Sequence, residues 1–95
     1  MWARVTTIVG EASRSDDAVQ MINGEVIPRM KELGMAAGGY WLLDRDSGRV
    51  VAVTLYETEQ ALRDSEAAAA ALRERAGQIG GTVESVDVFE VVGQL

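Results

Sequence analysis

The order in which two kinds of segment alternate along the chain is the feature that most limits its fold. Four segments are rich in β-branched and aromatic residues, which favour strands. They are residues 2–10, 37–44, 49–56 and 82–92. Two others, residues 13–33 and 58–76, repeat apolar side chains every three or four positions, as one face of a helix does. The order strand, helix, strand, strand, helix, strand predicts an α+β domain with a four-stranded antiparallel sheet.

Right-handed crossovers place the first and third strands at the centre of such a sheet and the other two at its edges. The third strand, residues 49–56, is apolar at almost every position from Val50 to Leu55, as a strand covered on both faces should be. Both helices must cover the same face. The other face then needs a cover of its own, and a second copy of the chain is the simplest one. We therefore expect a homodimer.

The ends of the first helix carry recognisable signals. Ser13 is expected to cap its start, and Gly34 to end it in the left-handed conformation. Pro28 lies inside the apolar repeat, where it lacks an amide hydrogen and crowds the carbonyl of Gly24. The repeat continues through the proline, so the sequence predicts a kink near Asn23 and not a break.

The second helix and the hairpin have similar signals. Thr58 is expected to cap the helix, whose buried face carries small and aliphatic side chains. These are Leu62, Ser65, Ala69, Leu72 and Ala76. Residues 45–48, Arg-Asp-Ser-Gly, form a tight turn between two strands, because Asp and Ser favour turns and Gly48 accepts a positive φ.

Composition excludes several classes of function. The chain of 95 residues has neither cysteine nor histidine, which removes disulfides, thiol nucleophiles, histidine bases and the usual zinc and haem ligands. Its net charge of −6 disfavours nucleic acid and anionic membrane surfaces as partners. No segment resembles a signal peptide or a membrane span, so we expect one cytoplasmic domain over residues 1–95 that needs no metal or cofactor.

At three places the chain resembles the dimeric α/β-barrel superfamily, a ferredoxin-like fold, and within it the antibiotic-biosynthesis-monooxygenase-like branch. The matching features are Gly34 after the first helix, the hairpin Tyr-Trp-Leu-Leu-Asp at 40–44 with Gly48, and Leu-Tyr-Glu-Thr-Glu-Gln-Ala-Leu at 55–62. The resemblance implies two four-stranded sheets that face each other in a dimer. It also implies activities that range from cofactor-independent oxidation of polycyclic phenols to haem degradation, and includes members with no assigned activity.

The chain departs from the catalytic patterns of these relatives. Tyr56 stands where the family's pocket tryptophan is expected, and Thr6 and Thr7 where haem-degrading relatives carry asparagine. Glu66 stands near the position of the haem-ligating histidine. These departures count strongly against haem degradation and less strongly against quinone-forming oxygenation.

The candidate ligand-binding residues are two polar strand residues, two aromatic residues and one arginine. They are Arg4, Thr6, Trp41, Thr54 and Tyr56. Trp41 and Tyr56 could stack on a flat ligand or only pack in the core or dimer interface. Arg4 could bind a carboxylate or phenolate, or pair with a carboxylate of a strand or of a partner subunit, such as Asp87 or Asp44. No residue is assigned a catalytic role.

Two functions follow. The first is a dimeric α/β-barrel protein of unassigned activity that binds a small hydrophobic or aromatic ligand. The alternative is a cofactor-independent monooxygenase that oxidises a phenolic or polyketide-like aromatic with molecular oxygen, which requires an electron-rich substrate held in a dry pocket. Whether the five residues surround a cavity or a filled core discriminates between a binding site and ordinary packing.

Overall fold

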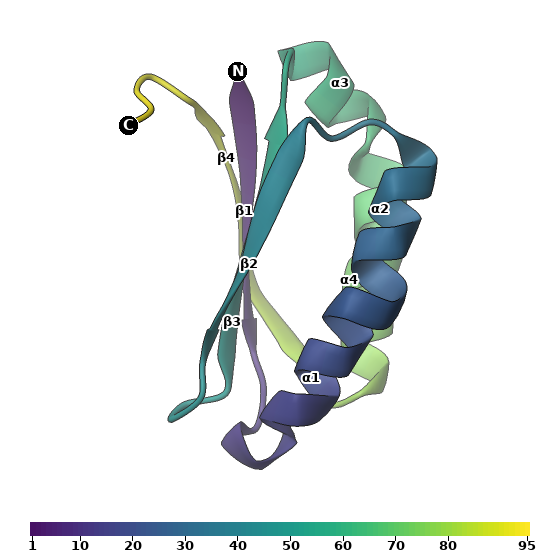
Figure 1. Cartoon of the computed structure of the whole chain (residues 1–95), viewed down its shortest axis with the longest axis vertical. Helices are drawn as coiled ribbons and strands as arrows, with labels where there is room; N and C mark the ends of the chain where they lie inside the picture. Colours follow the sequence, from purple (N-terminus) through teal and green to yellow (C-terminus); the bar gives the residue numbers. More distant parts are fainter.

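The computed structural model describes all 95 residues as one four-stranded antiparallel sheet with helices on one of its faces (Figure 1). The strands are β1 (Trp2–Val9), β2 (Gly38–Asp44), β3 (Arg49–Tyr56) and β4 (Thr82–Glu90). The helical elements are η1 (Ala12–Arg14), α1 (Ser15–Met21), η2 (Ile22–Val26), α2 (Ile27–Leu33), α3 (Glu59–Asp64) and α4 (Glu66–Gln78). The predicted α+β order is confirmed.

The sheet order is β2-β3-β1-β4, so the two strands predicted to be central are central. β1 runs antiparallel to both of its neighbours, and its pairing with β3 places Arg4 opposite Thr54 and Thr6 opposite Ala52. Directly opposed residues share a face of the sheet. Arg4, Thr6 and Thr54 therefore point to the same side, the side that the helices cover.

The first helical segment is continuous but changes its winding in the middle. η2 is a π-helical turn, in which the amide of Ile27 donates to the carbonyl of Ile22, five residues back. The irregularity predicted near Asn23 takes the form of this change in winding, and the helical segment is not broken there. Pro28 explains it, because a proline has no amide hydrogen to give to Gly24 and its ring needs the room that the wider turn provides. Gly34 ends α2 with φ of 65°, as predicted.

The start of this segment differs from the prediction. Ser13 caps nothing. It lies inside the 3₁₀ turn η1, and α1 begins at Ser15 without a side-chain cap. The hydroxyl of Ser15 instead donates to the carbonyl of Ala12 at 2.8 Å.

The second helical segment is divided where one helix was expected. α3 ends at Asp64 and α4 starts at Glu66, and the buried hydroxyl of Ser65 donates to the carbonyl of Leu62 at 2.7 Å. A serine can bond to a nearby backbone carbonyl in place of continuing the helix, which explains the change in direction. The predicted cap is confirmed, since Thr58 Oγ1 accepts from the amide of Ala61 at 3.0 Å.

The hairpin turn between β2 and β3 has the predicted form. The amide of Gly48 donates to the carbonyl of Asp44 at 2.8 Å, and Gly48 has φ of 78°. A Cβ at Gly48 would also lie 2.6 Å from the backbone of Ala12, so this glycine lets the hairpin pass close under η1. The turn thus fixes the end of the sheet against the start of the helical layer.

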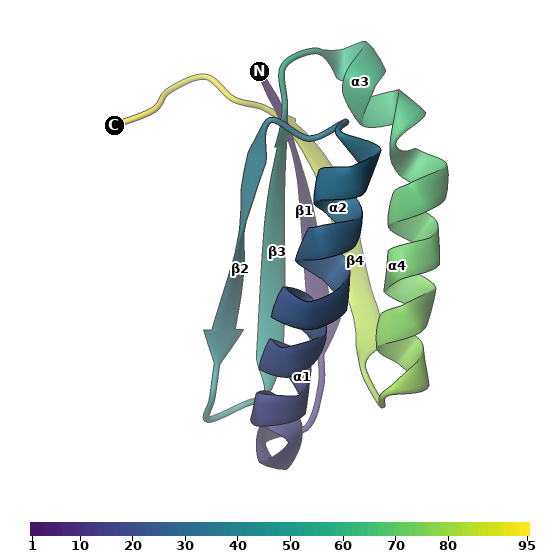
Figure 2. The same ribbon diagram turned by 45° about the vertical axis from the view of Figure 1, so that its right-hand side comes forward.

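The opposite face of the sheet carries no element of this chain (Figures 1 and 2). By the strand register it is formed by alternate residues that point away from the helices. They include Val5 on β1, Tyr40 and Leu42 on β2, Val51, Val53 and Leu55 on β3, and Phe89 on β4. Tyr40 is 67% exposed, Leu42 53% and Phe89 54%. This set is called the open face below.

The described chain contains no helix that is both long and apolar enough to cross a membrane.

Candidate functional site

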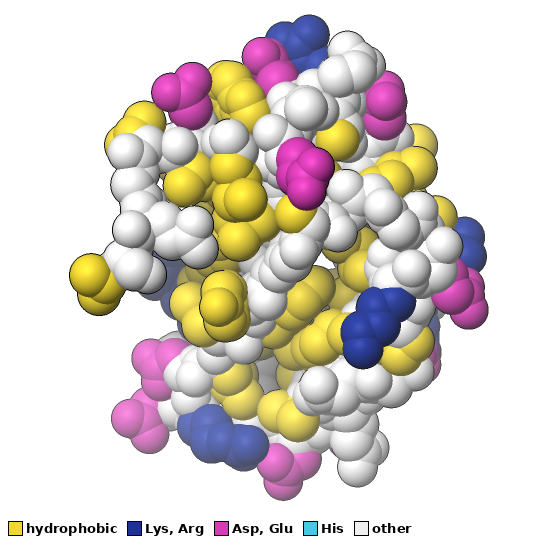
Figure 3. All heavy atoms as spheres, turned by 45° about the horizontal axis from the view of Figure 1, so that its top comes forward, with side chains coloured by type: hydrophobic (Ala, Val, Ile, Leu, Met, Phe, Trp, Pro, Cys, Tyr) yellow, Lys and Arg dark blue, Asp and Glu magenta, His cyan; other side chains and the backbone are white.

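A cavity lies between the covered face of the sheet and the helices. Its volume is about 120 Å³, and strands β1, β2 and β3 form one wall while α1, η2, α2 and α4 form the other. Figure 3 shows the molecule hollowed near the centre of one face, with mostly hydrophobic side chains around the hollow. The space between the two layers is therefore not completely filled.

The five residues singled out from the sequence all line this cavity. Arg4 and Thr6 come from β1, Trp41 from β2, and Thr54 and Tyr56 from β3. The register brings them together, because alternate residues of adjacent antiparallel strands project to one side. The five residues therefore surround a cavity and not a filled core.

Arg4 is the most highly connected of these side chains. It is 2% exposed, and its Nη1 donates to Tyr56 Oη at 3.0 Å while its Nη2 donates to the carbonyl of Leu62 at 2.9 Å. Nη2 also lies 3.0 Å from Glu66 Oε2. The guanidinium carbon lies 5.3 Å from the centre of the Tyr56 ring. Arg4 therefore connects β1 to β3, α3 and α4.

The prediction that Arg4 pairs with a strand carboxylate of its own chain was wrong. Asp44 and Asp87 were the candidate carboxylates, and the structure pairs Arg4 with Glu66 on α4 instead. Val5, not Arg4, stands opposite Asp87 in the sheet, and that pair lies on the open face. Because side chains alternate along a strand, an arginine on the covered face meets a carboxylate from the helical layer.

Tyr56 is fully buried, and its hydroxyl accepts the hydrogen bond from Arg4. Thr54 is also buried, and its hydroxyl lies 3.5 Å from the carbonyl of Arg4. Both side chains are therefore held by neighbours within the chain. The hydroxyl of Thr6 takes no part in the side-chain hydrogen bonds of the structure, although the residue is buried and lines the cavity.

Arg73 was not among the candidate residues chosen from the sequence. It projects from α4, lines the cavity, and forms an ion pair with Glu66, the same carboxylate that pairs with Arg4. Its Nη1 is buried without a hydrogen-bond partner, and so is Nε of Arg4. The only signal in the sequence was the spacing: Arg73 lies two turns beyond Glu66, so the two side chains share one side of the helix.

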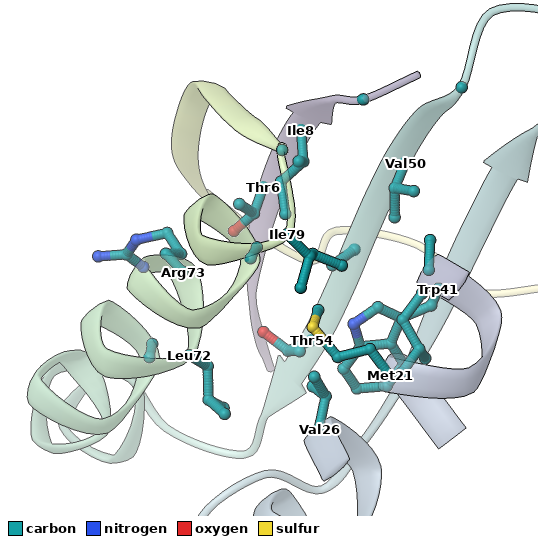
Figure 4. A pocket seen from close by; sticks show the side chains of 18 of the residues that line it. Thr6, Ile8, Met21, Val26, Trp41, Val50, Thr54, Leu72, Arg73 and Ile79 are labelled. Atoms are coloured by element: carbon teal, nitrogen blue, oxygen red, sulfur yellow. The ribbon is translucent and has the colours of Figure 1, made fainter. Parts of the chain in front are cut away.

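The remaining wall is apolar and comes largely from the first helical segment. Met21, Ile22, Val26 and Met30 line it, together with Leu72 and Ile79 from the second segment. Figure 4 shows Met21, Val26 and Trp41 gathered on one side of the pocket and Thr6 on the other, while the guanidinium of Arg73 points away from the pocket. The cavity is thus amphipathic, with an aromatic and aliphatic side and a polar side.

The described residues contain no cluster of three or more carboxylates that could hold a metal ion. The polar side chains around the cavity are mainly arginine guanidiniums and hydroxyls, which bind anions and polar organic groups, and Glu11 is the one carboxylate among them.

Comparison with protein-family models gives no match. Among curated proteins, two uncharacterized proteins of Mycobacterium tuberculosis are similar to this chain. One is 34% identical and the other 28% identical, each over 91 residues that make up 96% of this chain. Those residues span only 39% and 41% of the relatives' own lengths. This chain therefore corresponds to about two fifths of each relative.

Solved structures have the same fold. A monooxygenase from the gene ActVA-Orf6 of Streptomyces coelicolor, in complex with the ligand nanaomycin D, superposes with a TM-score of 0.76 at 21% identity, over 99% of this chain and 89% of the other. A proposed antibiotic biosynthesis monooxygenase from Deinococcus radiodurans gives 0.78 at 10% identity, over 100% and 96%. The fold implied by the sequence resemblance is confirmed.

Proposed function

We propose that this chain binds a small hydrophobic or aromatic molecule in the cavity between its sheet and its helices. The observation that carries the proposal is the convergence of the five candidate residues on an amphipathic cavity. An apolar cavity with a few oriented polar groups is the usual form of a small-molecule site. Trp41 supplies an aromatic surface, and Arg4 with Tyr56 supplies a rigid polar end.

The two tryptophans allow a direct test of ligand entry. Trp41 lines the cavity and Trp2 does not, so a Trp2→Phe variant reports only on the cavity. We expect saturable quenching or a spectral shift of its fluorescence when an aromatic ligand is added. The matched variant Trp41→Phe retains Trp2 alone and should show no saturable change. Equal responses of the two variants would mean that the ligand adheres to the surface, and the proposal would then be wrong.

We also propose that the protein works as a homodimer joined through the open face. Tyr40, Leu42 and Phe89 are large apolar side chains more than half exposed on one flat surface, which is unusual for a monomer of this size. A second copy would offer the same surface, as a two-fold symmetric interface requires. The cavity lies on the other side of the sheet, so dimerisation would leave it accessible.

The alternative function is a cofactor-independent monooxygenase. The fold shared with the Streptomyces monooxygenase favours it, and so does the buried pairing of Arg4 with Tyr56 at one end of the cavity. A phenolic substrate would supply the electrons itself. In the conversion of a phenol to a quinone, one atom of O₂ becomes the new carbonyl oxygen and the other leaves as water with the two hydrogens lost from the ring carbon and the hydroxyl.

An isotope experiment discriminates between the two functions. If the protein is an oxygenase, incubation with a phenolic substrate, ¹⁸O₂ and a metal chelator should consume one O₂ per substrate and place one label in the quinone. A binding protein should give no oxygen uptake above that of the substrate alone. The ligand should saturate the cavity whether or not the protein is an oxygenase. The fluorescence test therefore decides on binding, and the isotope test decides on oxygenation.

A further inference from the structure

One hydroxyl group in the wall of the cavity has no hydrogen-bond partner within the chain. Thr6 is 7% exposed and lines the cavity from β1, yet its side chain takes no part in the hydrogen bonds of the structure. The side-chain atoms that are enclosed without a partner are Nε of Arg4 and Nη1 of Arg73, and the Thr6 oxygen is not among them. The Thr6 hydroxyl therefore borders free space, and the free space beside it is the cavity. Buried hydroxyls are normally hydrogen-bonded, so a bonding group in the cavity would complete the site.

A second hydroxyl lies on the same wall. Thr54 is 8% exposed, and its oxygen lies 3.5 Å from the carbonyl of Arg4, which is a long and weak hydrogen bond. Thr54 stands opposite Arg4 in the sheet and Thr6 is two residues further along β1, so the two threonines are diagonal neighbours on one face. A threonine hydroxyl donates one hydrogen bond and accepts others. A ligand hydroxyl near this pair can accept from Thr6 and donate to Thr54.

The charged groups around the cavity balance each other. Three arginines line it, and three carboxylates are present to match them, one in the wall and two in ion pairs with these arginines. The arginines are Arg4, Arg14 and Arg73, and the carboxylates are Glu11, Asp17 and Glu66. The guanidinium of Arg73 also points away from the pocket in Figure 4. A charged ligand would thus leave water without gaining a counter-charge, a cost that an uncharged ligand does not have.

The size of the cavity limits the apolar part of the ligand. An apolar cavity of about 150 Å³ holds one benzene molecule, and this cavity measures about 120 Å³. It therefore has room for a single ring. Trp41 and Met21 lie on one side of the pocket and Thr6 on the other, so a ring placed against the first two directs a polar substituent toward Thr6 (Figure 4). A second fused ring would need the two layers to separate.

We propose that the ligand of this site is an uncharged compound with a single ring and one hydroxyl group, with its ring against Trp41 and its hydroxyl hydrogen-bonded to Thr6. This inference rests on the proposed binding function and adds the charge, the size and the polar group of the ligand. Thr6 is assigned as the residue that recognises the polar group. The hydroxyl of Tyr56 is already bonded to Arg4, whereas that of Thr6 is free to bond to a ligand.

The test compares benzyl alcohol with ethylbenzene, two molecules of nearly equal shape that differ by a hydroxyl in place of a methyl group. Binding to the intact chain is followed by NMR titration. Thr6→Val keeps the shape of the side chain and removes its hydroxyl. We expect the affinity for benzyl alcohol to fall about tenfold in this variant, because the ligand hydroxyl is then buried without that partner. The affinity for ethylbenzene should not fall.

The matched control is the next residue of the same strand. Thr7 is also 7% exposed but does not line the cavity, so Thr7→Val should leave the affinities for both ligands unchanged. An unchanged affinity for benzyl alcohol in a folded Thr6→Val variant would overturn the inference. An equal loss for both ligands would overturn it too, since that result indicates a change in the shape of the cavity and not a lost hydrogen bond. In both cases the binding function would stand.

The charge and the size of the ligand are tested on the parent protein. Benzoate and benzylamine keep the single ring but carry a charge, and 2-naphthylmethanol keeps the hydroxyl but adds a ring. All three should bind more weakly than benzyl alcohol, and tighter binding of any of them would overturn the inference. If neither benzyl alcohol nor ethylbenzene binds and Trp41 fluorescence responds to no aromatic ligand, the inference and the proposed function both fail.

Discussion

Leu72 shows how one side chain serves both the helical layer and the cavity. It was expected on the buried face of the second helical segment, and the structure places it there, in the cavity wall and only partly buried. Two other residues predicted for that face, Leu62 and Ala76, are buried. The side chain therefore contributes less to packing than a core leucine and more to the shape of the site.

Leu72→Ala is expected to cost about 2–3 kcal/mol in the free energy of unfolding, at the low end for leucine truncations, because the residue already borders an empty space. Urea denaturation followed by circular dichroism measures the change. The substitution also enlarges the cavity, so two-ring ligands should gain affinity. Leu95→Ala, at the exposed end of the chain, is the control and should leave the midpoint unchanged. A variant of Leu72 with an unchanged midpoint would contradict the placement of this side chain.

At the same scale, only those residues of the candidate site that come from strands could be predicted from the sequence. Side chains on strands alternate strictly, so Arg4 and Thr6 had to share a face of the sheet, as did Thr54 and Tyr56. The register observed in the structure then places both pairs on the same face. Arg73 could not be found in this way, because helical residues at several angles can reach a cavity. Its role depends on the position of Glu66, which follows from the division between α3 and α4.

At the scale of elements, local signals predicted where the chain changes direction better than how it does so. Pro28 predicted a kink, but a proline is compatible with a bend, a break or a π-turn, and the choice depends on the packing of Ile22 and Val26 against the sheet. Ser65 carried no signal strong enough to divide a helix, since serine is common within helices. Ser13 was wrongly chosen as a cap because the 3₁₀ turn before α1 was not visible in the pattern of apolar residues.

The cap of α3 gives the prediction at this scale. Thr58 accepts the amide hydrogen of Ala61, which would otherwise have no partner in the first turn. Thr58→Ala is therefore expected to lower the free energy of unfolding by about 1 kcal/mol. Thr58→Ser keeps the hydroxyl and should recover most of that loss in the same thermal or urea denaturation. If alanine and serine behave alike, the hydrogen bond makes no net contribution and the cap is not what starts α3.

At the scale of the whole molecule, the open face leads to a prediction about assembly. Light scattering at micromolar concentration should give about twice the chain mass of 10.2 kDa. Leu42→Glu places a charge on this apolar surface, at the edge strand β2, and should shift the mass to that of one chain without changing the circular dichroism spectrum. Ala70→Glu adds the same charge on an exposed position of α4 and should have no effect. A monomeric parent protein would contradict the proposed dimer.

The strand β3 has one further consequence. Val50, Ala52, Thr54 and Tyr56 point into the cavity, while Val51, Val53 and Leu55 belong to the open face. Odd and even positions of one strand are thus exposed to separate selective pressures. Substitutions at even positions change the wall of the cavity without changing the open face, and substitutions at odd positions change the open face alone. If the chain has the proposed ligand site and the proposed dimer surface, single substitutions one residue apart on β3 can therefore change one of them and leave the other as it is.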